Sequence, residues 1–168
     1  MMTNKHFGQR IAVLIDVQNL YHSAKNLHKA KVNFGEILKV AVADRNLIRA
    51  FAYVVKTKTG EEKSFFEALT KLGIETRVKD LQEFYGGAKK GDWDVGLAID
   101  AIRISPTLDA LVIVSGDGDF ISLVEYLKNQ GKRVEVIAFG KSSSHNLIEI
   151  ADEFTDLGKD YEQFLLKK

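Results

Sequence analysis

Aspartates stand at or just after the ends of two short apolar runs. Asp16 ends the run at residues 10–16, and Asp117 follows the run at residues 110–115 after one glycine. If the two runs are neighbouring strands, Asp16, Asp117 and Asp119 converge on one crevice, where like charges repel unless a cation lies between them. Hard divalent cations such as Mg²⁺ take oxygen ligands, so the pattern predicts a metal site. The alternatives are a helix N-cap for Asp16 and a turn residue for Asp117.

A third acidic group precedes an amphipathic stretch at residues 93–104. Either Asp92 or Asp94 could cap that helix. Asp94 shares a helical face with apolar residues at i+3, i+4 and i+7, so we expect it to point toward the sheet, where a shared cation would supply a partner. Asp100 lies on another side and can pair with Arg103 at i+3, which favours a structural role.

Short apolar runs alternate with amphipathic stretches along the chain. This alternation predicts an α/β fold with a mostly parallel sheet of about five strands and helices on both faces. In such sheets ligands bind beyond the carboxyl ends of the strands, where the aspartates stand. The expected strands are residues 10–16, 47–55, 74–79, 110–115 and 133–138. The expected helices are residues 18–30, 33–43, 61–72, 93–104, 120–129, 145–153 and 159–166, and residues 80–91 are expected to form a loop.

The length of 168 residues fits one domain. We expect an N-terminal tail at residues 1–9, the domain at 10–157 and a C-terminal helix at 158–168. The absence of Cys excludes disulfides, Cys-based zinc or iron–sulfur sites and a cysteine nucleophile. No apolar run approaches the ~18 residues of a membrane span, and the start lacks the apolar segment of a secretory signal. We therefore expect a cytoplasmic protein without a membrane partner.

Charge is unevenly distributed along the chain. The net charge is +1, but residues 1–91 contain 16 Lys and Arg against 9 Asp and Glu, and residues 92–168 contain 8 against 14. Such asymmetry suggests a nucleic acid or metal ligand. Two solvated faces of opposite sign would give the same balance.

Three motifs, taken in order, resemble those of a known family. IDVQNL at residues 15–20 is similar to the IDxxN opening of NYN domains, which belong to the PIN-like nuclease superfamily. KGDWDV at residues 90–95, followed by Asp100, resembles the family's KGxDV…D helix start. VSGDGDF at residues 114–120 resembles its SGDGDF strand end. The motifs RVEV at residues 133–136 and ADEF at 151–154 are similar to those of the LabA-like bacterial branch.

This resemblance implies a three-layer α/β/α sandwich with an acidic pocket that binds Mg²⁺ or Mn²⁺ and hydrolyses RNA phosphodiester bonds. The metal ligands it implies are Asp16, Asp94 and Asp117. Asp119 and Asn19 complete the catalytic set that the resemblance implies.

The substrate side of this hypothesis involves residues near the acidic set. Ser115 would orient the phosphate or a water molecule, and Lys89 and Lys90 would hold the RNA backbone. Phe84, Tyr85 and Trp93 could stack on unpaired bases or serve as hydrophobic anchors.

Two other functions remain open at this point. One is a non-catalytic RNA-binding or regulatory module of the same fold, and the other is a metal-dependent phosphoesterase acting on a small nucleotide. A homodimer or a protein partner is also compatible with the limited basic surface of one domain.

Overall fold

A computed structural model describes residues 5–56, 62–80, 82–83, 89–90 and 92–166. For Gln82, Glu83, Lys89, Lys90 and Tyr161 it describes the backbone alone. The strands are β1 (Arg10–Asp16), β2 (Asn46–Lys56), β3 (Glu75–Asp80), β4 (Gln82–Glu83), β5 (Lys89–Lys90), β6 (Ala110–Val114), β7 (Arg133–Ala138) and β8 (Glu153–Asp156). The α-helices are α1 (Val17–His28), α2 (Phe34–Val42), α3 (Lys63–Lys71), α4 (Asp94–Ile104), α5 (Ile121–Asn129), α6 (His145–Ile150) and α7 (Tyr161–Phe164).

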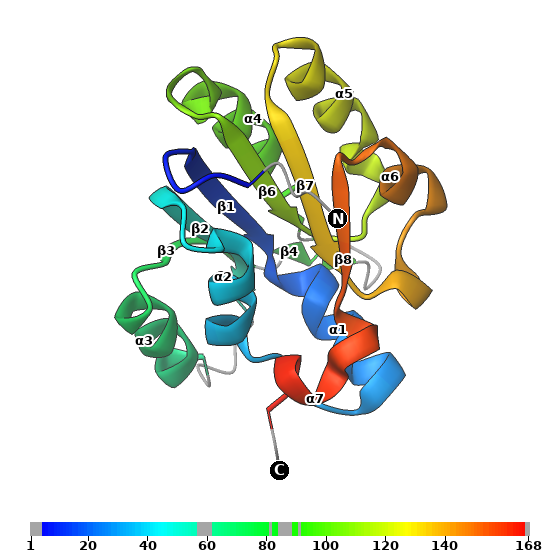
Figure 1. The fold of residues 1–168 in the computed structure, drawn as a ribbon. Helices are drawn as coiled ribbons and strands as arrows, with labels where there is room; N and C mark the ends of the chain where they lie inside the picture. Colours follow the sequence, from blue (N-terminus) through cyan, green and yellow to red (C-terminus); the bar gives the residue numbers. More distant parts are fainter. Residues whose placement is uncertain (1–4, 57–61, 81, 84–88, 91, 167–168) are drawn as a thin grey trace.

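The expected α/β architecture is confirmed as one six-stranded sheet. Its strand order is β3-β2-β1-β6-β7-β8, and every pair is parallel (Figure 1). The chain builds outward from β1 to β2 and β3, then returns to the other side of β1 with β6. The order therefore switches between β1 and β6, and the carboxyl ends of these two strands border the crevice where ligands bind in open α/β sheets.

Helices cover both faces of the sheet, as the apolar strands require. One core cluster joins β1, β2 and β6 to α1, α2, α3 and α7. The second cluster joins the opposite faces of the strands to α4, α5 and α6. The result is the three-layer arrangement expected from the sequence. Among the helices that the structure describes, none combines the length and apolar character that a membrane crossing demands.

The helix boundaries follow local capping signals. The side chain of Asn33 accepts a hydrogen bond from the backbone N–H of Glu36, which starts α2 where the Asn-x-x-Glu pattern predicts it. Gly73 and Gly131 end helical segments with φ of 80° and 82°, a left-handed conformation that a residue with a Cβ rarely adopts.

Four expectations about the chain's elements are wrong in detail. The sheet has a sixth strand, β8, and the helix expected to reach residue 153 ends at Ile150. The loop expected at residues 80–91 includes the short antiparallel pair β4–β5. The helix expected at 158–168 is a 3₁₀ turn, Leu157–Asp160, followed by the single-turn α7, whose Phe164 packs in the core.

A buried ion cluster lies on β7, away from the strand ends that carry the aspartates. Both carboxylate oxygens of Glu135 accept hydrogen bonds from Arg45, at 2.8 and 2.9 Å, and Arg133 donates a third at 2.9 Å. Glu135 and Arg45 are only 3% and 5% exposed. Burial raises the pKa of Glu135, but the cations of Arg45, Arg133 and Lys5 together lower it more, so its pKa lies below the ordinary range. Glu135 therefore stays ionised inside the protein.

A candidate metal centre at the ends of β1 and β6

Asp16 ends β1 and also caps α1. Its Oδ1 accepts a hydrogen bond from the backbone N–H of Asn19 at 3.2 Å, and its Oδ2 accepts one from the Ser115 hydroxyl at 3.0 Å. The N-cap alternative is therefore correct, but it does not exclude ligation. An ionised carboxylate offers about four acceptor positions, so two contacts leave room for a cation.

The turn after β6 holds Asp117 beside Asp16. The backbone N–H of Asp117 donates to Ser115 Oγ at 3.2 Å, and Asp117 Oδ1 accepts from the backbone N–H of Asp119 at 2.9 Å. The start of this turn is fixed from two sides, because the Gly116 N–H donates to Asn19 Oδ1 at 3.0 Å and the Gly116 carbonyl accepts from the Ser144 N–H at 2.9 Å. The turn-residue alternative is also correct, and it is this turn that directs the carboxylate.

Gly116 is required by a close contact with the segment after β7. A Cβ added at this position would lie 3.0 Å from the Cα of Ser143 and still closer to its side chain. A larger residue would therefore push the turn out of place. This explains the first glycine of the SGDGDF motif as a steric requirement rather than a requirement for unusual backbone angles.

Asp94 is the first residue of α4, which is fastened to the sheet by buried polar contacts. The indole N–H of Trp93 donates to the Val54 carbonyl at 3.0 Å. One helical turn and a half later, Asp100 accepts a hydrogen bond from the Tyr53 hydroxyl at 2.8 Å and lies 3.0 Å from Arg77 Nε. These contacts on β2 and β3 fix the helix start that carries Asp94.

The structural role expected for Asp100 is confirmed. Its pairing with Arg103 at i+3 is present at 3.8 Å. The partners Tyr53 and Arg77 come from other strands, and sequence spacing does not reveal them.

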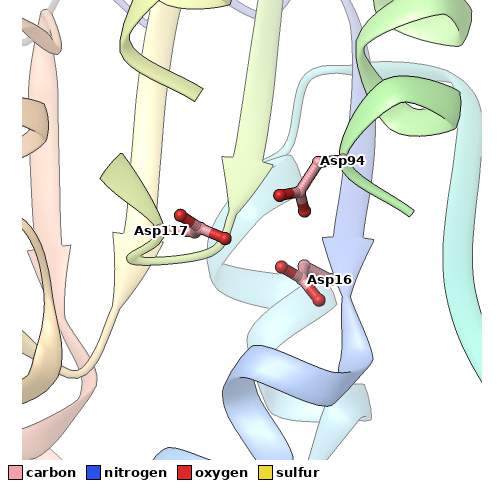
Figure 2. A group of neighbouring side chains, drawn as sticks. All are labelled: Asp16, Asp94 and Asp117. Atoms are coloured by element: carbon pink, nitrogen blue, oxygen red, sulfur yellow. The ribbon is translucent and has the colours of Figure 1, made fainter. Parts of the chain in front are cut away.

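Asp16, Asp94 and Asp117 converge from three separate elements (Figure 2). One carboxylate oxygen from each lies within 4.8 Å of the others, and all three residues are partly buried. The donor set consists entirely of hard oxygen ligands, which suits Mg²⁺ or Mn²⁺. The residues present therefore fit the metal that the sequence predicts.

The electrostatics of the cluster also favour a cation. Burial is the largest cause that raises the pKa of Asp16, although its two hydrogen bonds oppose the effect. Burial, followed by the nearby carboxylate of Asp117, raises the pKa of Asp94 to about 7. Three carboxylates held this close are therefore reluctant to ionise together without a compensating positive charge.

The remaining acidic candidates lie around this group. Asp119 is exposed, and its side chain is among the neighbouring groups that raise the pKa of Asp94. Asp92 is exposed, and its Oδ1 accepts from the backbone N–H of Asp94 at 3.3 Å, but the N-cap position of α4 is Trp93, so neither aspartate is the N-cap. Of the pair Asp92 and Asp94, it is Asp94 that joins the three-carboxylate group.

Of the aromatic and basic residues expected to contact RNA, the structure describes the side chain of Trp93 alone. Trp93 is a partly buried anchor, with its ring 5.4 Å from that of Tyr53 and the Lys79 ammonium 4.3 Å from its ring centre. Phe84 and Tyr85 lie outside the described residues. Lys89 and Lys90 form β5, and only their backbone is described.

Comparisons with known proteins agree with this geometry. The model of the NYN domain family matches residues 10–158. The chain is 26% identical to the Low amplitude and bright protein LabA of Synechococcus elongatus, in an alignment that covers 94% of this chain and 88% of LabA. It is 28% identical to an uncharacterized protein of Methanocaldococcus jannaschii, over 91% of this chain and 57% of that protein.

A solved structure has the same fold over the full chain. It is a protein of unknown function from Vibrio parahaemolyticus, with a TM-score of 0.87 and 33% sequence identity over 99% of this chain and 100% of that one. The family match spans all six strands of the sheet and the three converging carboxylates. The chain therefore belongs to the NYN domain family, as its IDVQN and SGDGDF motifs indicate.

Proposed function

We propose that this chain is a divalent-metal-dependent ribonuclease that hydrolyses RNA phosphodiester bonds at Asp16, Asp94 and Asp117. The observation that carries the proposal is the convergence of these carboxylates from β1, α4 and the turn after β6. Membership of the NYN family supports the same chemistry. Partly buried carboxylates that repel one another and have a raised pKa are typical of functional sites, which favours a role for the charge they hold.

In this proposal the three aspartates hold Mg²⁺ or Mn²⁺. A metal bound there would stabilise negative charge on phosphate oxygens and lower the pKa of a coordinated water. The chain's own contribution is to aim the carboxylates at one point. Ser115 does this for Asp16 through its hydroxyl, and Asn19 does it for the Asp117 turn through the Gly116 N–H.

Ser115 acts in this proposal as a positioning residue. It is fully buried, and its hydroxyl is committed to Asp16 and to the Asp117 backbone. Asp119 is exposed beside Asp94, at the edge of the proposed ligand set. Lys89 and Lys90 remain candidates for backbone contacts with RNA.

The test is a cleavage assay on a mixture of single-stranded and structured RNA with Mg²⁺, Mn²⁺ or chelator. We expect cleavage with metal, and its loss in chelator and in Asp16→Asn or Asp117→Asn. Asp44→Asn is a matched control, because Asp44 is exposed with φ of 61°, a conformation that Asn tolerates well. Metal binding without any cleavage would favour a regulatory module, and hydrolysis of short phosphate esters but not RNA would favour a nucleotide phosphoesterase.

A further inference from the structure

Three cationic side chains lie between edge strand β3 and helix α4, beside the acidic site. We call this set, Arg77, Lys79 and Arg103, the basic edge. Arg77 and Lys79 are two residues apart on β3, so both side chains point to the α4 side of the sheet. Arg103 is in the last turn of α4. Within the part of the chain that the structure describes, β3 is an edge strand that pairs with β2 alone.

The charge of Lys79 has no carboxylate partner among the described contacts. Its Nζ donates to the backbone carbonyl of Asp92 at 3.2 Å and lies 4.3 Å from the centre of the Trp93 ring. Both contacts orient the ammonium without neutralising it. The ammonium is thus held in place and still able to meet an anion.

Arg77 and Arg103 share one carboxylate. Asp100 lies 3.0 Å from Arg77 and 3.8 Å from Arg103, and it also accepts the Tyr53 hydroxyl. Two guanidinium groups against one carboxylate leave about one positive charge. Arg103 is 69% exposed, so its other donors face solvent.

Other surface arginines are neutralised one to one. Arg49 forms two hydrogen bonds of 2.8 Å to Glu75. Arg10 pairs in the same way with Asp109. Arg77 and Arg103 differ from these two arginines because they share a single carboxylate, that of Asp100.

The register of the sheet places the basic edge beside the carboxylates. Asp16 pairs with Tyr53 on β2, and Tyr53 pairs with Arg77 on β3. Two strand spacings separate the backbones of Asp16 and Arg77, about 10 Å. Lys79 lies two residues further toward the carboxyl ends, at the same end of the sheet as the acidic site.

We propose that the basic edge holds the phosphates of one RNA strand and leads that strand to the carboxylates of Asp16, Asp94 and Asp117. This inference rests on the proposed function and deepens it. A polyanion is the ligand that fits, because the cations form a short row of fixed, undercompensated charges next to a site for phosphodiester chemistry. An acidic cluster would repel RNA on its own, so an adjacent cationic surface is what would hold the substrate there.

The test is RNA binding by the full chain in chelator, where the proposed reaction does not proceed. Fluorescence anisotropy of a labelled single-stranded oligonucleotide gives the affinity between 50 and 200 mM salt. The variant Lys79→Gln/Arg103→Gln should reduce the slope of log K against log salt by about 1.4, at about 0.7 per lost phosphate contact. That loss corresponds to roughly tenfold weaker binding near physiological salt.

Two further variants separate charge from folding. Lys79→Arg keeps the charge and should bind as the wild type does. Lys25→Gln is the matched control, because Lys25 also lies over an aromatic ring, 5.9 Å from the centre of Tyr21, but on α1 across the sheet. If the double variant melts at a lower temperature than the wild type, Arg103→Gln alone still tests the contribution of charge to RNA binding. It changes a largely exposed side chain and should leave the fold intact.

Cleavage with Mn²⁺ then distinguishes the two proposals. We expect the basic-edge variants to raise KM with little change in kcat. Wild-type affinity, salt slope and KM in these variants would overturn the basic edge while leaving the ribonuclease in place. A wild-type chain that neither binds nor cleaves RNA would overturn both.

Discussion

Replacing Asp94 with Asn should make the metal-free protein more stable and the metal-loaded protein less stable. The carboxyl pKa of Asp94 is raised to about 7, mainly by burial and then by Asp117. The folded chain therefore binds this proton more tightly than the unfolded chain, whose Asp pKa is about 3.9. Metal-free wild type accordingly loses stability as pH rises from about 4 through 7, and above pH 7 the loss is complete.

The size of this effect follows from the distances in the cluster. Charges 4.8 Å apart repel by about 1 kcal/mol in water and about 3.5 kcal/mol at an effective dielectric of 20. Asp94→Asn removes two of the three pairwise repulsions. Because the three residues are only partly buried, we discount the sum for solvent screening to about 1–2 kcal/mol. At 2–4 °C per kcal/mol for a chain of this size, Tm at pH 8 should rise by about 4 °C.

Bound Mn²⁺ should make the wild type more stable than Asp94→Asn, the reverse of their order in chelator. At a Mn²⁺ concentration of about 100 times Kd, binding stabilises the wild type by about 2.7 kcal/mol. The Asn variant has lost one charged ligand; at about 100-fold weaker affinity it should gain only about 0.4 kcal/mol, which leaves it less stable than the metal-loaded wild type. Thermal unfolding at pH 8, with chelator and with a Mn²⁺ series, measures both effects.

The matched control is again Asp44→Asn, whose curves should follow the wild type in both conditions. At pH 5 wild type and Asp94→Asn should melt within about 1 °C of each other in chelator, because Asp94 is then protonated. The reasoning is refuted if the Asn variant melts below the wild type in chelator at pH 8. Equal stabilisation of both by Mn²⁺ would refute the assignment of Asp94 as a ligand.

Three other predictions concern the acidic site and the buried ion cluster. Glu135→Gln leaves the buried Arg45 without its carboxylate and should cost about 3–5 kcal/mol, seen as a Tm at least about 6 °C lower; an unchanged Tm would contradict the cluster's role. Gly116→Ala forces a contact with Ser143 and should weaken Mn²⁺ binding about 10- to 100-fold in a metal titration; wild-type affinity would show that the turn tolerates a Cβ. The Mn²⁺-induced rise in Tm should shrink as pH falls from 8 to 6, because protons compete for Asp94 with its raised pKa, and a rise independent of pH would count against that carboxylate as a ligand.

Much of the fold follows from patterns that are local in the sequence. Buried parallel strands are almost continuous apolar runs, so β1, β6 and β7 are predicted from their residues alone. Strand β8 is not, because Glu-Phe-Thr-Asp contains one large apolar residue and is half-buried at the sheet edge. Its strand conformation depends on pairing with β7, which no local pattern records.

The residues of the site also separate into those that the sequence predicts and those that it does not. Asp16 and Asp117 are predictable because they end neighbouring strands, and Asp94 because it shares a helical face with apolar residues. Arg77 and Lys79 are not, because β3 has a polar sequence that reads as a solvated edge. Their importance arises only when α4 packs beside β3 and brings Asp100 and Trp93 into contact with them.

The most direct test of the central claim is Mn²⁺-dependent cleavage of single-stranded RNA by the wild type and by Asp117→Asn, purified side by side. We expect cleavage by the wild type with Mn²⁺, none in chelator, and a loss in the Asn variant while its fold persists. Full cleavage by Asp117→Asn, or by the wild type in chelator, would contradict it.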